Sequence, residues 1–413
     1  MLAWCSLGAL VIVMLVSCTT QLNVGVLAIA FAWVVGVFIA GLTPREVLAA
    51  FPYDLFIILA GVTLLFTQAQ LNGTLDRVAH HAVKLCRGNK GLMPVTFFVL
   101  GAVIASAGPG NISTAAMLGP MAMTVASRAS IPPFLMAIMV GNGAQAGALS
   151  PVAPTGLIVA KLMAEKVGLP GHELQTYLAN LVAHAIVAFG GYLLFGGWKL
   201  FRSSFTGDAA EGGQVRFERT HWITLGVIAV VLVPVLTLKA HIGMASFAGA
   251  SVLAALRVAD HEQAIRRMPW TPIIMVCGVS VLVGLLEKTG GLDLFSSMLA
   301  RFATENTLTG FVALVTAVIS VYSSTSSVVL PAFLPTVPRL VMLVGGDPLS
   351  VATSMNVAAH LVDMSPLSTT GAVCIAAIAD PAQVRPTYNK LLAWGLSMTI
   401  VGTIGCYLFF LIF

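Results

Sequence analysis

Four short segments of this chain gather small and polar residues, hydroxyl side chains above all, where a continuous apolar helix would be expected. Two lie in the middle of long apolar stretches and read Gly108-Pro109-Gly110-Asn111-Ile112-Ser113-Thr114 and Tyr322-Ser323-Ser324-Thr325-Ser326-Ser327. The other two share the pattern Ser-Pro-x-x-x-Thr-Gly and begin at Ser150 and Ser365. In the two Ser-Pro segments proline removes a backbone donor and glycine permits a turn, so each should split its crossing into two half-helices.

Such breaks can bind ions at membrane depth. The N-terminus of a half-helix presents unpaired N–H groups and a partial positive charge to an anion, whereas freed carbonyl oxygens at a C-terminal end can coordinate sodium. Serine, threonine and asparagine add neutral donors and acceptors. Two N-termini that meet from opposite sides would suit a small molecule with two carboxylates. The alternative is that these small and hydroxyl residues only allow helices to pack closely.

The rest of the chain is strongly apolar. It has 413 residues, of which 58% are hydrophobic and 9% are charged, whereas a soluble domain has roughly 25% charged residues. This composition excludes a soluble globular protein and indicates an all-α protein that crosses a membrane many times. The net charge of +5 does not indicate nucleic-acid binding, because the basic residues form short clusters between apolar runs. The six cysteines form no CxxC pair and are interpreted as packing residues.

Apolar runs that could cross a membrane occur ten times. We predict spans near residues 2–18, 22–42, 55–71, 134–162, 174–198, 222–237, 242–256, 272–286, 349–378 and 391–413. Two further stretches, 91–129 and 307–340, are interrupted in the middle, and we predict that each is a re-entrant hairpin of two half-depth helices. The first run ends in a sequence that resembles a lipoprotein cleavage box, but it begins without Lys or Arg. We therefore interpret it as a retained span.

The second half of the chain repeats the pattern of the first half. At an offset of 217 residues Gly61-Val62-Thr63 falls on Gly278-Val279-Ser280, and at an offset of 215 the two Ser-Pro-x-x-x-Thr-Gly segments coincide. Each half contains five predicted spans and one hairpin, so the second half should lie upside down in the membrane relative to the first. Inverted repeats of this kind are typical of secondary transporters. With an outward-facing N-terminus, most basic residues fall on the cytoplasmic side.

The repeat predicts the domain boundaries. The first inverted repeat covers 1–200, with scaffold helices in 1–71, an in-plane arm at 74–89, a hairpin at 91–129, a broken helix at 131–168 and a helix at 173–199. A cytoplasmic linker is predicted at 201–220. The second inverted repeat covers 221–413, with scaffold helices in 221–288, an arm at 292–305, a hairpin at 307–340, a broken helix at 347–380 and a helix at 388–413.

The four breaks also supply the candidate site residues. The candidates for substrate binding are Asn111, Ser113, Thr114, Ser324, Thr325, Ser326, Pro154, Thr155, Thr369 and Thr370. The candidates for sodium are Gly110, Asn111, Ser150, Ser323, Ser365 and Ser368. Asp363 precedes the second Ser-Pro break by two residues and is the candidate coupling residue, because an ionisable group inside a membrane helix indicates function. We predict no catalytic residue, and no cofactor apart from sodium as a coupling ion.

At these residues the sequence resembles the ion transporter superfamily. The likeness is greatest, in size and in the GPGN-IST and SPVAPTG segments, to the MatC-type dicarboxylate (malonate) carriers, which are related to the divalent anion/sodium symporters. In the symporters each hairpin tip carries a Ser-Asn-Thr motif nine residues before a proline. Asn111 precedes Pro120 by that spacing, so the resemblance implies that Asn111, Ser113 and Thr114 contact substrate carboxylate and sodium. The second tip departs from the family because it contains no Asn.

The resemblance also implies a homodimer in which transport domains move against a scaffold by an elevator mechanism. We therefore expect a multi-pass protein of the bacterial inner membrane that moves small dicarboxylates, such as malonate or succinate, by symport with sodium or protons. Its expected partners are a dicarboxylate anion, the coupling ion, the lipid bilayer and a second copy of the chain, without nucleic acid.

Other classes of function are compatible with parts of the sequence. A sodium/proton antiporter of the same superfamily would need only Asp363 and no anion site. An intramembrane enzyme agrees less well, because the sequence contains no HExxH, GxSxG or paired-aspartate motif. A passive channel also agrees less well, because broken helices in two inverted repeats are typical of alternating access.

Overall fold

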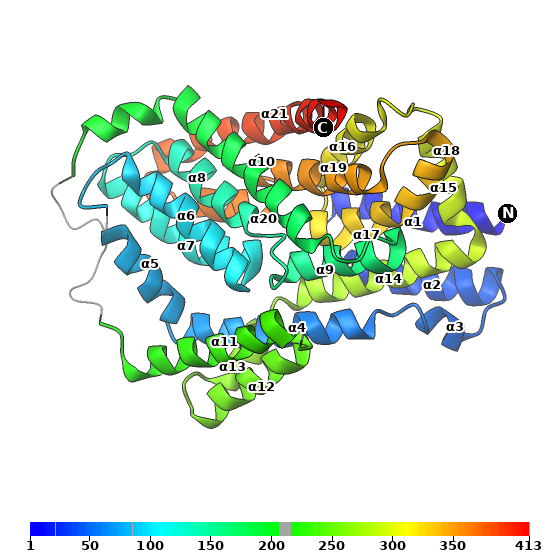
Figure 1. Cartoon of the computed structure of the whole chain (residues 1–413), viewed down its shortest axis with the longest axis horizontal. Coiled ribbons are helices and arrows are strands. Elements are labelled where there is room, and N and C mark those ends of the chain that lie inside the picture. The colour runs from blue at the N-terminus through cyan, green and yellow to red at the C-terminus, as the bar shows by residue number, and fades with distance from the viewer. Residues whose placement is uncertain (21, 85, 206–215, 239, 413) are drawn as a thin grey trace.

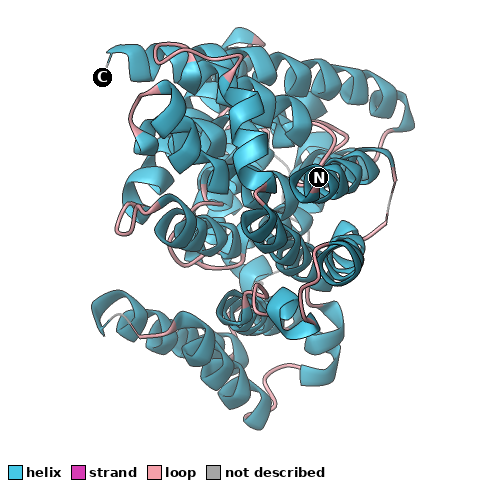
Figure 2. Ribbon diagram, turned by 90° about the vertical axis from the view of Figure 1, so that its right-hand side faces the viewer, coloured by secondary structure: helices cyan, strands magenta, loops and turns pink. Residues whose placement is uncertain are grey.

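The computed structural model describes residues 1–20, 22–84, 86–205, 216–238 and 240–412, which form helices and loops (Figure 2). This part of the chain contains six helices that are long and apolar enough to cross a membrane, and six shorter apolar helices. Together with the composition, these helices confirm a polytopic all-helical membrane protein. Half of the predicted linker at 201–220, residues 206–215, lies outside the described residues.

The first half of the chain consists of the helices α1 to α10 and three short π- or 3-10-helical segments. The helices of the predicted scaffold are α1 (Leu2–Thr19), α2 (Val24–Trp33) with its π-helical continuation η1 (Val34–Ile39), α3 (Pro44–Leu48) and α4 (Tyr53–Leu71). The arm is α5 (Thr74–Lys84), and the hairpin is α6 (Leu92–Ala107) followed by α7 (Gly110–Arg128). The broken crossing is α8 (Pro133–Ala146) and α9 (Pro154–Leu162), which continues as η2 (Met163–Val167). This half ends with α10 (Glu173–Leu194) and the 3-10 turn η3 (Gly197–Arg202).

The second half has the same order of elements. It begins with α11 (Arg219–Leu238), α12 (Ile242–Ala255), α13 (His261–Arg267) and α14 (Trp270–Thr289), followed by the arm α15 (Gly291–Ala300). The hairpin is α16 (Leu308–Ser320) and a long second arm, which consists of η4 (Thr325–Val329), α17 (Leu330–Phe333), η5 (Leu334–Thr336) and α18 (Val337–Val344). The broken crossing is α19 (Pro348–Leu361), η6 (Val362–Met364) and α20 (Thr369–Ala376), and α21 (Pro381–Ile412) ends the chain.

Helices of the two halves pair in matching ways. α2 packs against α14 and α4 against α12, while α6 packs against α8 and α16 against α19. Glycines mark the closest approaches: a Cβ on Gly25 would lie 2.2 Å from the carbonyl oxygen of Ile274, and a Cβ on Gly61 would lie 2.3 Å from that of Gly243. Backbones approach this closely because neither helix carries a side chain at the crossing. Figure 1 shows α4 and α12 along the lower side of the molecule.

The crossing of α2 and α14 should not accept a larger residue. We expect Gly25→Ala to lower the free energy of unfolding by about 1–3 kcal/mol, because the new methyl group would overlap the Ile274 backbone and force the helices apart. Thermal denaturation of the purified protein measures this loss. Gly8→Ala in α1 is the matched control, since a Cβ there meets nothing within 4 Å. Equal melting temperatures for the two variants would contradict the close crossing.

The second arms of the hairpins are longer than the half-depth helices that the sequence predicts. α7 has 19 residues and the segment Thr325–Val344 has 20, so each extends about 29 to 30 Å along its axis. Their prolines do not end them. Pro120 lies inside α7, and Pro331 and Pro335 lie where the helix changes from π-helical to α-helical and then to 3-10 geometry.

Other boundaries also differ from the sequence prediction. The last helix begins at Pro381 instead of 388, because Pro386 is accommodated inside it. Two short helices, α3 and α13, were not predicted. They begin 217 residues apart behind the capping residues Thr43 and Asp260, so they follow the offset of the repeat. Their brevity hides them from any search based on hydrophobic periodicity.

Candidate functional site

The first hairpin turns at two glycines and restarts as α7. Gly108 and Gly110 have positive φ angles of 138° and 75°, which L side chains rarely adopt. A Cβ on Gly108 would also lie 2.0 Å from the ring of Phe66, so both the backbone and the packing require glycine there. Asn111 is the second residue of α7, and 6% of it is exposed. The turn therefore fixes a buried amide in the first turn of a helix.

The first broken crossing stops at the end of α8 and restarts as α9. Ser150 closes the connection, because its Oγ donates to the Ser106 carbonyl oxygen at 2.7 Å. A Cβ on Gly156 would lie 2.0 Å from the Ser150 carbonyl oxygen, which explains the glycine of the Ser-Pro-x-x-x-Thr-Gly motif. At the start of α9, the Thr155 Oγ1 donates to the Asn111 Oδ1 at 3.4 Å. The N-termini of α7 and α9 therefore meet.

The second broken crossing repeats this local geometry. The Ser365 Oγ accepts a bond from the Leu367 N–H at 3.2 Å, and a Cβ on Gly371 would lie 2.1 Å from the Ser365 carbonyl oxygen. Ser368 caps α20 by accepting from the Gly371 N–H at 3.3 Å, and its hydroxyl donates to the backbone carbonyl of Asp363. Each serine before the proline therefore shapes a turn instead of facing an open space.

A network of hydrogen bonds joins both hairpins to both broken crossings. The Asn111 Nδ2 donates to the Gln145 Oε1 at 2.9 Å. The Gln145 Nε2 donates to the Thr370 Oγ1 at 3.2 Å and to the Asp363 Oδ2 at 3.5 Å. On the other side, the Thr325 Oγ1 donates to the Asp363 Oδ1 at 2.9 Å. Gln145 at the end of α8 therefore connects the two halves of the chain.

Asp363 supplies the carboxylate of this network. Its side-chain partners among the described residues, Thr325 and Gln145, are both neutral. An intramembrane carboxylate without a basic partner keeps its capacity to bind a proton or a small cation. The geometry at Asp363 therefore has the chemistry that a coupling residue needs.

A small cavity, here called the tip cavity, lies beside the network. Its volume is about 50 Å³. The residues of the hairpins and of α9 that line it are Pro109, Gly110, Asn111, Ile112, Ser113, Pro154, Thr155, Ile158, Ser326 and Ser327. Three helix N-termini, those of α7, α9 and η4, therefore surround one space, where their partial charges and N–H groups favour an anion. The opposite wall consists of α4 and the residues at the start of α14.

Several predicted site residues lie elsewhere. The Ser323 Oγ lies 2.8 Å from the Ser17 Oγ of α1, so this hydroxyl contacts the predicted scaffold. Thr369 at the start of α20 is exposed, whereas Thr370 is buried within the network. Thr114 is buried, and its Oγ1 has no hydrogen-bond partner among the described residues. The Ser324 carbonyl accepts the first backbone bonds of η4.

Gln145 and Ser327 were not among the predicted site residues. Gln145 lies on an apolar helix five residues before the Ser150-Pro151 break. A polar amide inside an apolar membrane helix is a feature of the sequence that could have indicated its role. Asn180 reinforces the break, because its Nδ2 donates to the Gln145 carbonyl oxygen at 2.8 Å. The Gln145 carbonyl oxygen also accepts from the Ala148 N–H at 3.1 Å, so protein groups satisfy it at the end of α8.

The bonds of Gln145 should stabilise the fold measurably. We expect Gln145→Leu to lower the free energy of unfolding by about 1–3 kcal/mol, because the change removes the acceptor of the Asn111 Nδ2 and a donor to the Asp363 Oδ2. Gln68→Leu in α4 is the matched control. Gln68 is also buried, but its Oε1 has no partner among the described residues, so its loss should cost little. Melting temperatures of the two variants test this difference, and equal losses would contradict the network.

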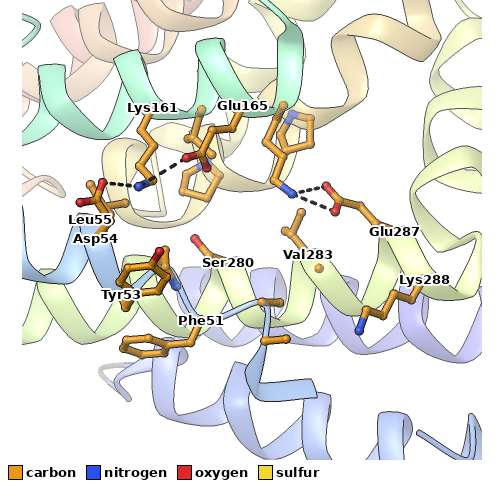
Figure 3. Close-up of a pocket in the computed structure, with 18 residues that line it drawn as sticks. Phe51, Tyr53, Asp54, Leu55, Lys161, Glu165, Ser280, Val283, Glu287 and Lys288 are labelled. Carbon is orange, nitrogen blue, oxygen red and sulfur yellow. Dashed lines mark hydrogen bonds and ion pairs between the residues drawn. The ribbon is translucent and has the colours of Figure 1, made fainter. Parts of the chain in front are cut away.

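A second and larger cavity, here called the charged cavity, lies along the contact between α4 and α9 (Figure 3). Its volume is about 390 Å³. The Lys161 Nζ lies 2.5 Å from the Asp54 Oδ2 and 3.4 Å from the Glu165 Oε1. The Lys166 Nζ lies 2.7 Å from the Glu287 Oε1. Asp54 and Glu287, two acidic residues on membrane-spanning helices, are therefore paired with lysines.

Part of the chain matches a known protein family. Residues 1–148 match the family described as the N-terminus of the dicarboxylate carrier protein MatC, which confirms the predicted resemblance over that part of the chain. Among curated relatives, an uncharacterized transporter of Mycobacterium bovis is 25% identical over 313 residues, which cover 72% of this chain and 70% of the relative. The 46 kDa membrane protein of Mycobacterium leprae is 23% identical over 287 residues, which cover 66% of this chain and 63% of that protein.

Among solved structures, MtrF of Neisseria gonorrhoeae, from a class of antimetabolite efflux pumps, has a similar fold. The TM-score is 0.55 at 13% sequence identity, over 88% of this chain and 82% of MtrF. At this identity the likeness concerns the fold alone.

Proposed function

We propose that this membrane transporter, whose first 148 residues match the MatC carriers, moves small dicarboxylates such as malonate or succinate across the bacterial inner membrane by symport with sodium or protons. The observation that carries this proposal is the convergence of three helix N-termini on the tip cavity. Each N-terminus supplies roughly half a positive charge and free N–H groups. Two carboxylates on one small molecule match such a set of neighbouring donors.

The neutral character of this site favours transport over tight binding. The described residues that line the tip cavity include no lysine or arginine. A buried arginine would bind a carboxylate through strong bidentate hydrogen bonds and slow its release. Helix N-termini, Asn111 and Ser113 replace the water around the anion without a full opposing charge, which suits a site that must both load and unload.

We also propose two inverted repeats, each with five spans and a hairpin, and an elevator movement within a homodimer. The matching helix pairs and the coincidence of α3 and α13 at one offset support the repeats. The network from Asn111 through Gln145 and Asp363 to Thr325 supports one moving body, because it ties both hairpins to both broken crossings. The scaffold of this proposal is α1–α4 and α11–α14.

The coupling ion is proposed to bind close to Asp363 and the first turn of α7. Gly110 and Asn111 lie at the tip cavity. The side-chain amide of Gln145 bridges Asn111 and the carboxylate of Asp363 by hydrogen bonds to both. Sodium would lower the repulsion between Asp363 and an incoming dianion, and a proton on Asp363 would do the same. Either ion would therefore couple its own binding to that of the substrate.

Ligand-dependent thermal stability tests this proposal. Malonate or succinate should raise the melting temperature of the purified protein, and at one hundred times the dissociation constant the stabilisation should reach about 2.7 kcal/mol. Acetate should give far less, because one carboxylate engages only part of the site. Replacing sodium by choline, at several pH values, shows which ion the effect requires. Equal stabilisation by acetate and malonate, or none by either, would contradict a dicarboxylate site.

A sodium/proton antiporter is the second candidate function. The observation that favours it is the neutral surroundings of Asp363, since an antiporter needs one carboxylate that binds sodium and protons in turn. This candidate gives no role to the helix N-termini at the tip cavity. Sodium-dependent proton movement in the absence of any dicarboxylate would support it.

A further inference from the structure

The charged cavity and the tip cavity follow the same pair of helices. Leu55 of α4 and Leu162 of α9 line the charged cavity. Leu59 and Ile158, about one helical turn farther along the same two helices, line the tip cavity. The contact between α4 and α9 therefore extends from the charged cavity to the tip cavity.

Two ion pairs join α9 and its continuation η2 to α4 and α14. Lys161 and Lys166 lie on α9 and its continuation η2, which belong to the proposed moving body. Their partners, Asp54 on α4 and Glu287 on α14, belong to the proposed scaffold. Figure 3 shows Lys161 extending toward Asp54, with Glu287 on the opposite side of the cavity. The pairs therefore join the two walls of the charged cavity.

Asp54 is held on its other oxygen as well. The His241 Nε2 lies 2.7 Å from the Asp54 Oδ1, and His241 is the residue before α12, which packs against α4. This second contact fixes the carboxylate on the scaffold side. The Asp54 carboxylate is therefore already in position to accept Lys161 of α9 when the two walls of the cavity are in contact.

The equivalent positions of the repeat cannot form these pairs. At the offset of 217 residues Asp54 corresponds to Thr271 and Glu287 to Gln70, and at 215 Lys161 corresponds to Ala376. In a carrier with inverted repeats, the two end states exchange the roles of the two halves. Ion pairs present at only one of two equivalent contacts would stabilise only one of those states.

We propose that the charged cavity is the access vestibule of the transport site, and that the Asp54–Lys161 and Glu287–Lys166 pairs hold its walls together in the state seen here. This inference rests on the proposed function, because it assigns the contact to movement of α9 against α4 and α14. The paired side chains are 17–37% exposed, so water screens each pair and thermal motion can open it. The pairs set the population of this state and the rate at which the path opens.

Cysteine labelling measures the opening of this path. Ile158→Cys places a thiol between the two cavities, where it should react slowly with an uncharged, water-soluble thiol reagent in detergent. Adding Lys166→Glu places a second carboxylate opposite Glu287. The two carboxylates repel each other, so the labelling should become about three- to tenfold faster. Adding Glu287→Lys as well restores an ion pair with reversed charges and should return the rate close to that of the parent. Peptide mass spectrometry distinguishes position 158 from the native cysteines.

Lys288→Glu is the matched control for charge. Lys288 lines the same cavity, but its Nζ donates to the Glu46 carbonyl oxygen at 2.8 Å, and both residues lie on scaffold helices. We expect Lys166→Glu to make the labelling faster. Lys288→Glu should not have this effect, and adding Glu287→Lys to Lys166→Glu should reverse it. An unchanged rate, an equal effect of Lys288→Glu, or no reversal would overturn the inference. The labelling requires no transported solute, so this outcome is separate from a failure of the proposed function.

Discussion

Replacing Asn111 with alanine should weaken dicarboxylate binding by about 10- to 100-fold. Asn111 lies in the first turn of α7, lines the tip cavity and is bonded to Gln145 and Thr155. The variant loses a donor for the substrate carboxylate. It also loses the hydrogen bond from Asn111 that holds the Gln145 side chain between the two halves. The concentration of malonate that gives half of the maximal thermal stabilisation measures the change in affinity.

Asn356→Ala is the matched control for this prediction. Asn356 is a fully buried amide on α19, but its Nδ2 only approaches the Met163 Sδ at 3.8 Å, and it takes no part in the network. Its loss should leave the affinity for malonate unchanged even if it lowers the melting temperature. If Asn111→Ala bound malonate as tightly as the parent, the hairpin tip would not be the substrate site.

Replacing Asp363 with asparagine should abolish gradient-driven accumulation while leaving exchange of substrate across the membrane. The introduced amide has nearly the same shape and can still accept from Thr325 and lie beside Gln145. It carries no charge, so it binds neither a proton nor sodium with comparable strength. Proteoliposomes loaded with unlabelled dicarboxylate measure exchange, and proteoliposomes with an imposed ion gradient measure accumulation.

The same variant separates the two candidate functions. In a symporter, substrate exchange persists after Asp363→Asn, whereas in an antiporter the parent exchanges sodium for protons without any anion and the variant does not. Asp293→Asn is the control, because Asp293 is an exposed carboxylate on the arm α15, 69% exposed, near Arg339. It should leave both exchange and accumulation unchanged. Accumulation that survives Asp363→Asn would remove Asp363 from the coupling mechanism.

The helix breaks could be predicted from local sequence because their causes are local. α7 begins at Gly110 and α9 at Pro154, where residues of special backbone geometry stand. Glycines such as Gly25 and Gly61 also stand out in the sequence, because they cannot be exchanged without displacing a neighbouring backbone. These features depend on a few residues and their spacing.

The partners of the polar residues could not be predicted in this way. Gln145 meets Asp363 across 218 residues of sequence, and Lys161 meets Asp54 across 107. Such contacts depend on how packed helices bring their ends together, which hydropathy patterns do not encode. The same reason explains Ser323, whose hydroxyl contacts α1 although its sequence context indicates the binding site. A hydroxyl-rich turn indicates a site, but neighbouring helices decide which of its side chains face it.

The length of the second hairpin arms shows another limit of local patterns. Pro331 and Pro335 suggest a short, interrupted helix, but changes of helical geometry absorb them in the segment Thr325–Val344. Proline removes one donor and displaces one turn, and a tightly packed neighbour can compensate for that loss. The same applies to Pro120 within α7.

Uptake of radiolabelled malonate and succinate into proteoliposomes is the measurement that tests the central claim most directly. The purified protein is reconstituted and given an inward sodium gradient, an inward proton gradient or neither, beside the Asn111→Ala variant. We expect uptake above the equilibrium level with one of the two gradients, competition between the two dicarboxylates, and strong loss in the variant. No gradient-dependent uptake of either dicarboxylate by a folded protein, or full uptake by Asn111→Ala, would contradict a dicarboxylate symporter that binds its substrate at the hairpin tips.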